Sequence, residues 1–148
     1  MTAKRSQRLN LVLDLAKRKQ AQADRFLAEA TQRVQQAEAQ REQLQKYLLE
    51  YQMQFTQAGQ QGLSPAQLQN HQAFINRLQT ALRQQAQTLN LAQQQLEQVT
   101  RHWQETYAQT QGVDKLTQKV LQEEQRQQDK KEQQAIDERA QHRTPGPF

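Results

Sequence analysis

The sequence predicts an all-α fold in which two long helices form an antiparallel, intramolecular coiled-coil hairpin. Three observations predict it: a composition that favours helix, one interior group of helix breakers, and apolar residues spaced three and four apart on both sides of that group. The expected single domain spans 1–143, with a helix over 6–58, a turn over 59–64 and a helix over 65–142. A flexible tail is expected over 144–148.

The composition excludes most other fold classes. Gln occupies 36 of the 148 positions, and Ala, Glu, Lys, Leu, Arg and Gln together occupy 100. These residues lose little conformational freedom in a helix. Gly (4) and Pro (3) are too few for the turns of a sandwich, barrel or α/β fold. With 34% hydrophobic residues the chain cannot build a large core, so the spacing of those residues must decide between helix and disorder.

The interior turn carries the signals of one helix ending and another beginning. Gly59 can adopt the left-handed conformation that closes a helix. Ser64 is a good N-cap, Pro65 suits the first helical position, and Gln67 completes a Ser-x-x-Gln capping box. The second helix meets no comparable stop before residue 143, apart from Gly112, which predicts a soft point.

Before the turn, a stripe with steps of three and four is apolar at twelve of its fourteen positions. The stripe comprises Leu9, Leu13, Ala16, Gln20, Ala23, Leu27, Ala30, Val34, Ala37, Arg41, Leu44, Leu48, Tyr51 and Phe55. After the turn, the same repeat runs through Leu68, His71, Ile75, Leu78, Leu82, Gln85, Leu89, Ala92, Leu96, Val99 and Trp103, and more weakly through Thr106, Thr110, Val113, Thr117 and Val120. A sustained 3.5-residue repeat predicts a left-handed coiled coil.

Residues equidistant from the turn are expected to face each other. The predicted pairs are Phe55 with Leu68, Leu48 with Ile75, Val34 with Leu89, Leu27 with Leu96, and Gln20 with Trp103. The second helix is longer than the first and should overhang it. Its segment 123–134 is entirely polar, so it is expected to project as a helix or to fray.

No constellation of catalytic or metal-binding residues is recognisable. His71, His102 and His142 lie far apart, and none has a second ligand four residues on. The chain has no cysteine, no phosphate-binding glycine loop and no nucleophile elbow. We therefore expect a non-enzyme without metal or cofactor. No apolar run is long enough to span a bilayer, and a cytoplasmic location is expected.

Positive charge is concentrated at the start of the chain. Residues 1–25 hold seven basic and two acidic side chains, a net +5 that equals the charge of the whole chain. A basic helix end of this kind is typical of a surface that binds nucleic acid, an anionic membrane or an acidic protein. The alternative is that it is only a solvated helix face. Nucleic acid is disfavoured because no aromatic residues are interleaved for base stacking.

Aromatic side chains widen the apolar stripe near the turn. Tyr47 and Phe74 flank the predicted seam and, with Ala81, extend it on one side, bordered by Gln40 and Gln85. An aromatic patch on a Gln-rich surface is typical of a docking site. The alternative is that these side chains only thicken a poor core near the turn.

Two segments near the turn complete the pattern: Tyr47-Leu48-Leu49-Glu50-Tyr51 and His71-Gln72-Ala73-Phe74-Ile75. Together with the chain length, the basic start, the Gly-containing turn, the single Trp103 and the polar tail, they resemble the FliJ family, the small coiled-coil cytoplasmic components of the bacterial flagellar type III protein export apparatus. The resemblance implies a hairpin similar to the γ-subunit stalk of the rotary ATP synthase.

The resemblance also implies three partners and a location. They are the export ATPase hexamer, for which the hairpin is a central stalk, the cytoplasmic linker of the export gate membrane protein, and export chaperones. The implied location is the cytoplasmic face of the inner membrane. The family's gate-binding surface corresponds to Gln40, Leu44, Tyr47, Tyr51, Phe74, Leu78, Ala81 and Gln85, although the family pattern has His at the last position. The ATPase-binding end corresponds to Lys4, Arg5 and Arg8 and to the distal second helix. The alternative from sequence alone is a structural coiled-coil spacer or scaffold unrelated to export.

Overall fold

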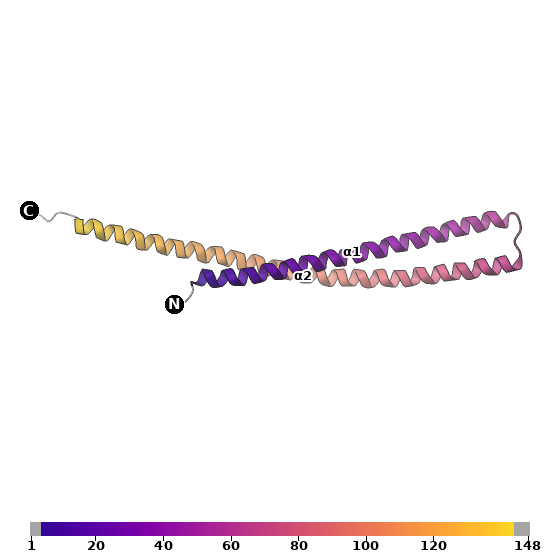
Figure 1. Ribbon diagram of the computed structural model, residues 1–148, viewed down its shortest axis with the longest axis horizontal. Coiled ribbons are helices and arrows are strands. Elements are labelled where there is room, and N and C mark those ends of the chain that lie inside the picture. The colour runs from indigo at the N-terminus through magenta and orange to yellow at the C-terminus, as the bar shows by residue number, and fades with distance from the viewer. Residues whose placement is uncertain (1–3, 144–148) are drawn as a thin grey trace, which may run out of the picture. The chain divides into compact units, whose positions relative to one another are not determined.

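The protein consists of two long α-helices joined by one short turn, as predicted (Figure 1). The computed structural model describes residues 4–143. Helix α1 spans Arg5–Gly59 and helix α2 spans Pro65–Arg143, and no strand occurs within these residues. The predicted tail over 144–148 lies outside the described residues.

The chain divides into two compact units, and both helices contribute to each. The turn unit is Ala23–Trp103, and the terminal unit is formed by the described parts of Met1–Gln22 and Gln104–Phe148. The sequence predicted one hairpin domain and contained no signal for this division. Each unit has its own interhelical contacts and is described separately below.

The capping box at the start of α2 is confirmed. The Ser64 N–H donates to Gln67 Oε1 (2.9 Å), and the Gln67 N–H donates to Ser64 Oγ (3.2 Å). The prediction for Gly59 is wrong, because this glycine is the last residue of α1 and Gly62 has the positive φ, at 91°. Hydrogen bonds from Gln61 N to Ala58 O (3.1 Å) and from Gly62 N to Gly59 O (3.2 Å) prolong the helical turn, so the reversal falls at Gly62.

Aliphatic side chains form the core of the turn unit. Val34 and Leu89 are buried in one cluster with Ala37 and Ala92, which agrees with the predicted pairing of the first two. Phe55 stacks on His71, with ring centroids 3.3 Å apart, and Leu68, the residue predicted to face Phe55, is 52% exposed.

Another departure from the predicted seam is Arg41, which is exposed at a stripe position. A long charged side chain placed at the edge of a seam can turn its head group into water.

Threonine replaces aliphatic residues along α2 in the terminal unit. The buried side chains here are Ser6 and Leu13 of α1 and Thr106, Thr110, Thr117 and Val120 of α2. Thr110 Oγ1 donates to the carbonyls of Thr106 (2.9 Å) and Ala16 (3.3 Å), and Thr117 Oγ1 donates to the carbonyl of Val113 (2.8 Å). The predicted repeat therefore continues, with hydroxyl groups satisfied by backbone carbonyls.

The polar end of α2 is helical, which decides between the two predicted alternatives. The side chains of residues 125–142 are all exposed, while the helix continues to Arg143. Gln125 donates to Asp129 (3.0 Å) and Gln133 donates to Asp137 (3.1 Å), each across one helical turn. Such i,i+4 bonds stabilise a helix without a packed core. Gly112 also lies within the uninterrupted α2.

Candidate protein-docking face

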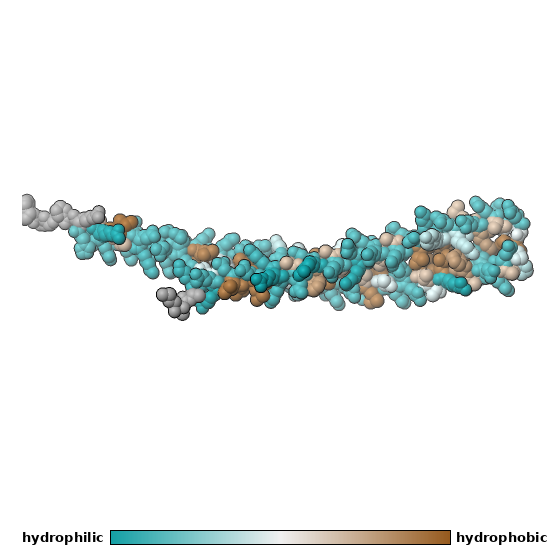
Figure 2. Space-filling model, viewed as in Figure 1, coloured by the Kyte–Doolittle hydropathy of each residue, from teal (hydrophilic) through white to brown (hydrophobic). Residues whose placement is uncertain are grey.

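The eight residues predicted to dock the export gate lie in the turn unit, on facing segments of α1 and α2. We call them the widened face: Gln40, Leu44, Tyr47 and Tyr51 from α1, and Phe74, Leu78, Ala81 and Gln85 from α2. Hydrophobic residues gather on the surface near the turn, within a mostly hydrophilic envelope (Figure 2).

Aromatic rings connect the two helices at one end of the widened face. Tyr51 packs against Phe74, with ring centroids 4.3 Å apart and planes tilted by 49°. Tyr51 also stacks on His71 at 5.0 Å, and His71 in turn stacks on Phe55. Aromatic pairs of this kind add to the stabilisation that burial alone provides. The hairpin near its turn is therefore held by rings, with His71 between two of them.

The outer aromatic residues of the widened face remain accessible. Tyr47 is 51% exposed and Phe74 is 40% exposed, whereas Leu44, Tyr51 and Leu78 are half-buried. The phenol of Tyr47 accepts a hydrogen bond from Gln43 Nε2 (3.2 Å), one turn earlier on α1. The exposed rings thus lie beside a partly buried apolar column, as the spacing predicted.

Glutamines close the other end of the widened face. Gln85 Nε2 donates to the Ala37 carbonyl (3.1 Å) and to Gln40 Oε1 (3.1 Å), so one side chain of α2 bonds twice to α1. The sequence placed Gln85 as a polar member of the repeat at the border of the patch, and the structure shows that it forms interhelical hydrogen bonds there. The face therefore combines an aromatic end with an amide end.

His71 has an unusual environment that the sequence did not indicate. Its Nδ1 is buried and has no hydrogen-bond partner within the described chain. The sequence identified His71 only as a member of the repeat, because ring stacking depends on the rotamers of residues in both helices. The rings of Tyr51 and Phe55 stack on the imidazole of His71 and do not bond to its nitrogens.

The predicted ATPase-binding residues, Lys4, Arg5 and Arg8, lie exposed at the start of α1. The first turn of α1 contains no acidic residue. Glu124 of α2 accepts a hydrogen bond from the Ser6 N–H (3.2 Å), so a carboxylate lies at the helix start.

Hydrogen bonding determines the direction of the pKa shift of Glu124. The Ser6 hydroxyl contributes most to holding the pKa of Glu124 below its usual value, and the Ser6 N–H and the charge of Lys4 add to this effect, while desolvation opposes it. Sequence reasoning missed this contact because it joins residues 118 apart. It also missed the bond from Trp103 Nε1 to Asp24 Oδ1 (2.6 Å) in the turn unit.

Residues 4–143 contain no group of three or more His, Cys, Asp or Glu side chains placed to hold a metal ion. Neither helix, over its described length, has a stretch apolar enough to cross a bilayer.

Comparison with family models identifies the chain. The model described as "Flagellar FliJ protein" matches residues 5–145, which is nearly the whole length. No match was found among curated proteins or among solved structures. The helical hairpin described above agrees with the fold that the resemblance implied. The chain therefore belongs to the FliJ family, whose members are non-enzymatic components of the bacterial flagellar export machinery.

Proposed function

We propose that this protein binds the cytoplasmic linker of the export gate membrane protein through the widened face. The observation that carries the proposal is the exposure of Tyr47 and Phe74 beside the half-buried Leu44, Tyr51 and Leu78. Exposed aromatic residues around a partly buried apolar column are the anchors that dominate binding energy in protein interfaces.

The division of labour among the aromatic residues supports a docking role. Tyr51, Phe55 and His71 make the ring contacts within the hairpin, and Phe74 shares one of them. Tyr47 has half of its surface in solvent and bonds only to Gln43 of its own helix among the contacts described. Replacing Tyr47 by alanine should therefore weaken the binding of a partner more than it lowers the stability of the fold.

The other end of the hairpin is proposed to bind the export ATPase hexamer as its central stalk. Exposed Lys4, Arg5 and Arg8 supply positive charge, and the exposed helix over 125–142 supplies a surface that no part of the described chain covers. Export chaperones are proposed as further partners, and the protein is proposed to act in the cytoplasm at the inner membrane. No catalysis, cofactor, metal or nucleic acid is part of this function.

The test is the double variant Tyr47→Ala, Phe74→Ala, measured by titration calorimetry against the purified gate linker. We expect a loss of about 2 kcal/mol or more of binding free energy. Circular dichroism should show unchanged helicity and near-normal melting, while binding to the export ATPase should persist. In a flagellated cell the variant should slow flagellar secretion.

A matched control is the double variant Leu49→Ala, Met53→Ala. Both side chains are more than 60% exposed, at 62% and 64%, and neither belongs to the widened face. The control removes a comparable apolar area and should leave gate binding intact. If the Tyr47, Phe74 variant unfolds, these rings belong to the core and the docking proposal fails. If the variant still binds the gate linker but no longer binds the ATPase, the two partners have been assigned to the wrong ends of the hairpin. If the parent chain binds neither partner, the protein is a spacer unrelated to export.

A further inference from the structure

The amide end of the widened face carries hydrogen-bonding groups that the hairpin itself leaves unused. Gln85 Nε2 on α2 donates to the Ala37 carbonyl (3.1 Å) and to Gln40 Oε1 (3.1 Å) on α1. A glutamine side chain has two N–H donors and one carbonyl acceptor. Both donors of Gln85 are therefore used, whereas Gln85 Oε1 and the two N–H groups of Gln40 have no partner within the described chain.

The two bonds fix how these unused groups are presented. Gln85 is half-buried and bonded twice to α1, so its amide cannot turn freely, and its bond to Gln40 Oε1 orients the exposed amide of Gln40. In each amide the unused atom is attached to the same carbon as the bonded atom, so the free donor and the free acceptor lie side by side. A donor beside an acceptor is the complement of one amide group, which offers a carbonyl oxygen and an N–H.

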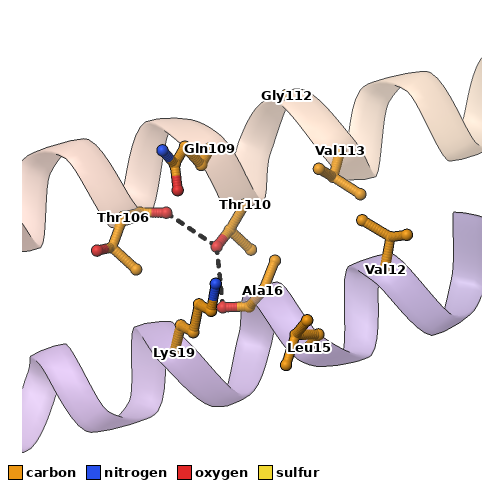
Figure 3. Close-up of a pocket in the computed structure, with 9 residues that line it drawn as sticks. All are labelled: Val12, Leu15, Ala16, Lys19, Thr106, Gln109, Thr110, Gly112 and Val113. Atoms are coloured by element: carbon orange, nitrogen blue, oxygen red, sulfur yellow. Dashed lines mark hydrogen bonds between the residues drawn. The ribbon is translucent and has the colours of Figure 1, made fainter.

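Other polar side chains between the helices have used their donors within the hairpin. In the terminal unit, the one hydroxyl proton of Thr110 is directed to the carbonyls of Thr106 and Ala16 (Figure 3). In the turn unit, Trp103 Nε1 has a single proton and donates it to Asp24. Neither contact leaves a free donor next to a free acceptor, as the bond between Gln85 and Gln40 does.

The neighbourhood of these two glutamines is apolar on the side toward the turn. Gln40 lies one helical turn before Leu44 on α1, and Gln85 lies one turn after Ala81 on α2. The free amide groups therefore terminate the apolar column of the widened face. A few fixed polar groups beside an apolar surface are what orients a ligand that the apolar surface holds.

We propose that Gln40 and Gln85, the amide pair, bind one amide group of the gate linker and so set the direction in which the linker lies on the widened face. Gln40 Nε2 donates to the carbonyl oxygen of that group, and Gln85 Oε1 accepts from its N–H. Apolar side chains of the linker then lie over Tyr47 and Phe74, nearer the turn. This inference rests on the proposed docking role of the widened face.

The pattern of the amide pair excludes charged groups as equally good ligands. A carboxylate has no proton for Gln85 Oε1, and an ammonium group has no acceptor for the N–H groups of Gln40, so each satisfies only half of the pair. An amide satisfies both halves. It is supplied either by a peptide unit of the linker backbone or by an Asn or Gln side chain, and the experiment below distinguishes these sources.

Gln40→Glu tests the free donor with little change in shape. The new carboxylate still accepts the bond from Gln85 Nε2, so the contact between the helices is retained, but the two N–H groups are lost. Titration calorimetry against the purified gate linker should show binding weakened by about tenfold or more, because an acceptor then faces the linker carbonyl. Circular dichroism should show unchanged helicity and near-normal melting.

The matched control for the added charge is Gln36→Glu. Gln36 is exposed one helical turn before Gln40 on α1 and does not belong to the amide pair. This variant introduces the same charge and should change the affinity by less than about twofold. Gln85→Met removes the free acceptor and should weaken binding by about tenfold, whereas Gln84→Met, at the exposed neighbouring position, should bind as the parent chain does.

Two series of synthetic linker peptides identify the amide group. One replaces each Asn or Gln by Ala, and the other methylates one backbone nitrogen at a time. We expect one peptide to bind the parent chain about tenfold more weakly than the unmodified linker, yet to bind Gln85→Met no more weakly than the unmodified linker does. A peptide of the first series identifies a side-chain amide, and one of the second series identifies a backbone amide.

The proposal is overturned by unchanged binding of Gln40→Glu, by an equal loss in Gln36→Glu, by unfolding of Gln40→Glu, or by the absence of such a peptide from both series. Failure of the docking role itself looks different, because the parent chain would then not bind the linker at all. If the parent chain binds the linker and Gln40→Glu binds it equally well, the docking role stands and only the amide pairing is wrong.

Discussion

The turn unit and the terminal unit share one heptad repeat but fill it with different side chains. In the turn unit the buried positions include Val34 and Leu89, with aromatic rings nearer the turn. In the terminal unit, three of the buried α2 positions are threonines, and α1 contributes Ser6. Spacing thus decides which residues face each other, whereas the type of side chain decides how strongly the two helices are held together.

The difference has a direct energetic meaning. Burying a Leu, Ile or Val side chain contributes about 1.5–3 kcal/mol. A buried Thr contributes one methyl group and a hydroxyl that must be hydrogen-bonded to avoid a penalty. The stability of the hairpin should therefore be concentrated in the turn unit. Four substitutions test this, given in order of decreasing loss of stability.

Leu89→Ala removes a side chain from the buried cluster of the turn unit and leaves a cavity beside Val34. We expect the free energy of unfolding to fall by about 2–4 kcal/mol in urea titrations followed by circular dichroism. Leu91→Ala is the matched control, because Leu91 lies in the same helix and is 61% exposed. An equal loss for both variants would contradict the assigned seam.

Ser64→Ala removes the acceptor of the Gln67 N–H at the start of α2. The loss should be about 1 kcal/mol, measured in the same titrations. Ser64→Asp keeps an acceptor at this position and should retain most of the stability. If the two variants are equally destabilised, the cap contributes through its backbone conformation and not through this bond.

Thr110→Val replaces a buried hydroxyl of the terminal unit by a methyl group of similar size. The bonds to the carbonyls of Thr106 and Ala16 are lost, and apolar burial is gained in exchange. The free energy of unfolding should change by less than about 1 kcal/mol. A loss as large as that of Leu89→Ala would show that the bond to Ala16 joins the helices more strongly than the comparison allows.

Glu124→Gln should have the smallest effect, because the carboxylate lies at the surface. Its pKa is lowered in the folded state, so its charge stabilises the fold at pH values above the ordinary pKa of a glutamate, and this contribution is lost as the pH falls through the lowered value. The melting temperature of the variant should be slightly below that of the parent chain near neutral pH and equal to it once the pH has fallen below the lowered pKa of Glu124. A difference that persists in acid would exclude the charge as its cause.

Local chemistry explains which parts of the fold could be predicted from sequence. The capping box of Ser64 and Gln67 needs only residues within one turn, and the cluster of Val34 and Leu89 follows from the repeat. Gly59 was assigned wrongly because Gly62 lies three residues away, and local preference does not choose between two glycines in one turn. The stacking of Phe55 on His71 was missed because it depends on how side chains interlock across the helices.

The candidate sites were predictable to a different degree. The exposure of Tyr47 and Phe74 follows from their position beside the seam, and the structure agrees with it. The contact between Ser6 and Glu124 depends on which residues the longer helix brings to the start of α1, and neither capping rules nor the repeat specify that.

The threonine hydroxyls of the terminal unit have one further consequence, for how the helices separate. Thr110 and Thr117 each donate to a carbonyl of their own helix four residues earlier. When α1 moves away, these bonds remain, and no newly stranded hydroxyl raises the energy of the parted state. We therefore expect the two helices to separate reversibly, and at a small cost in free energy, from the end of the hairpin opposite the turn. Helix α2 keeps its helical form in this process, and its inner face becomes available for exchange with another helix.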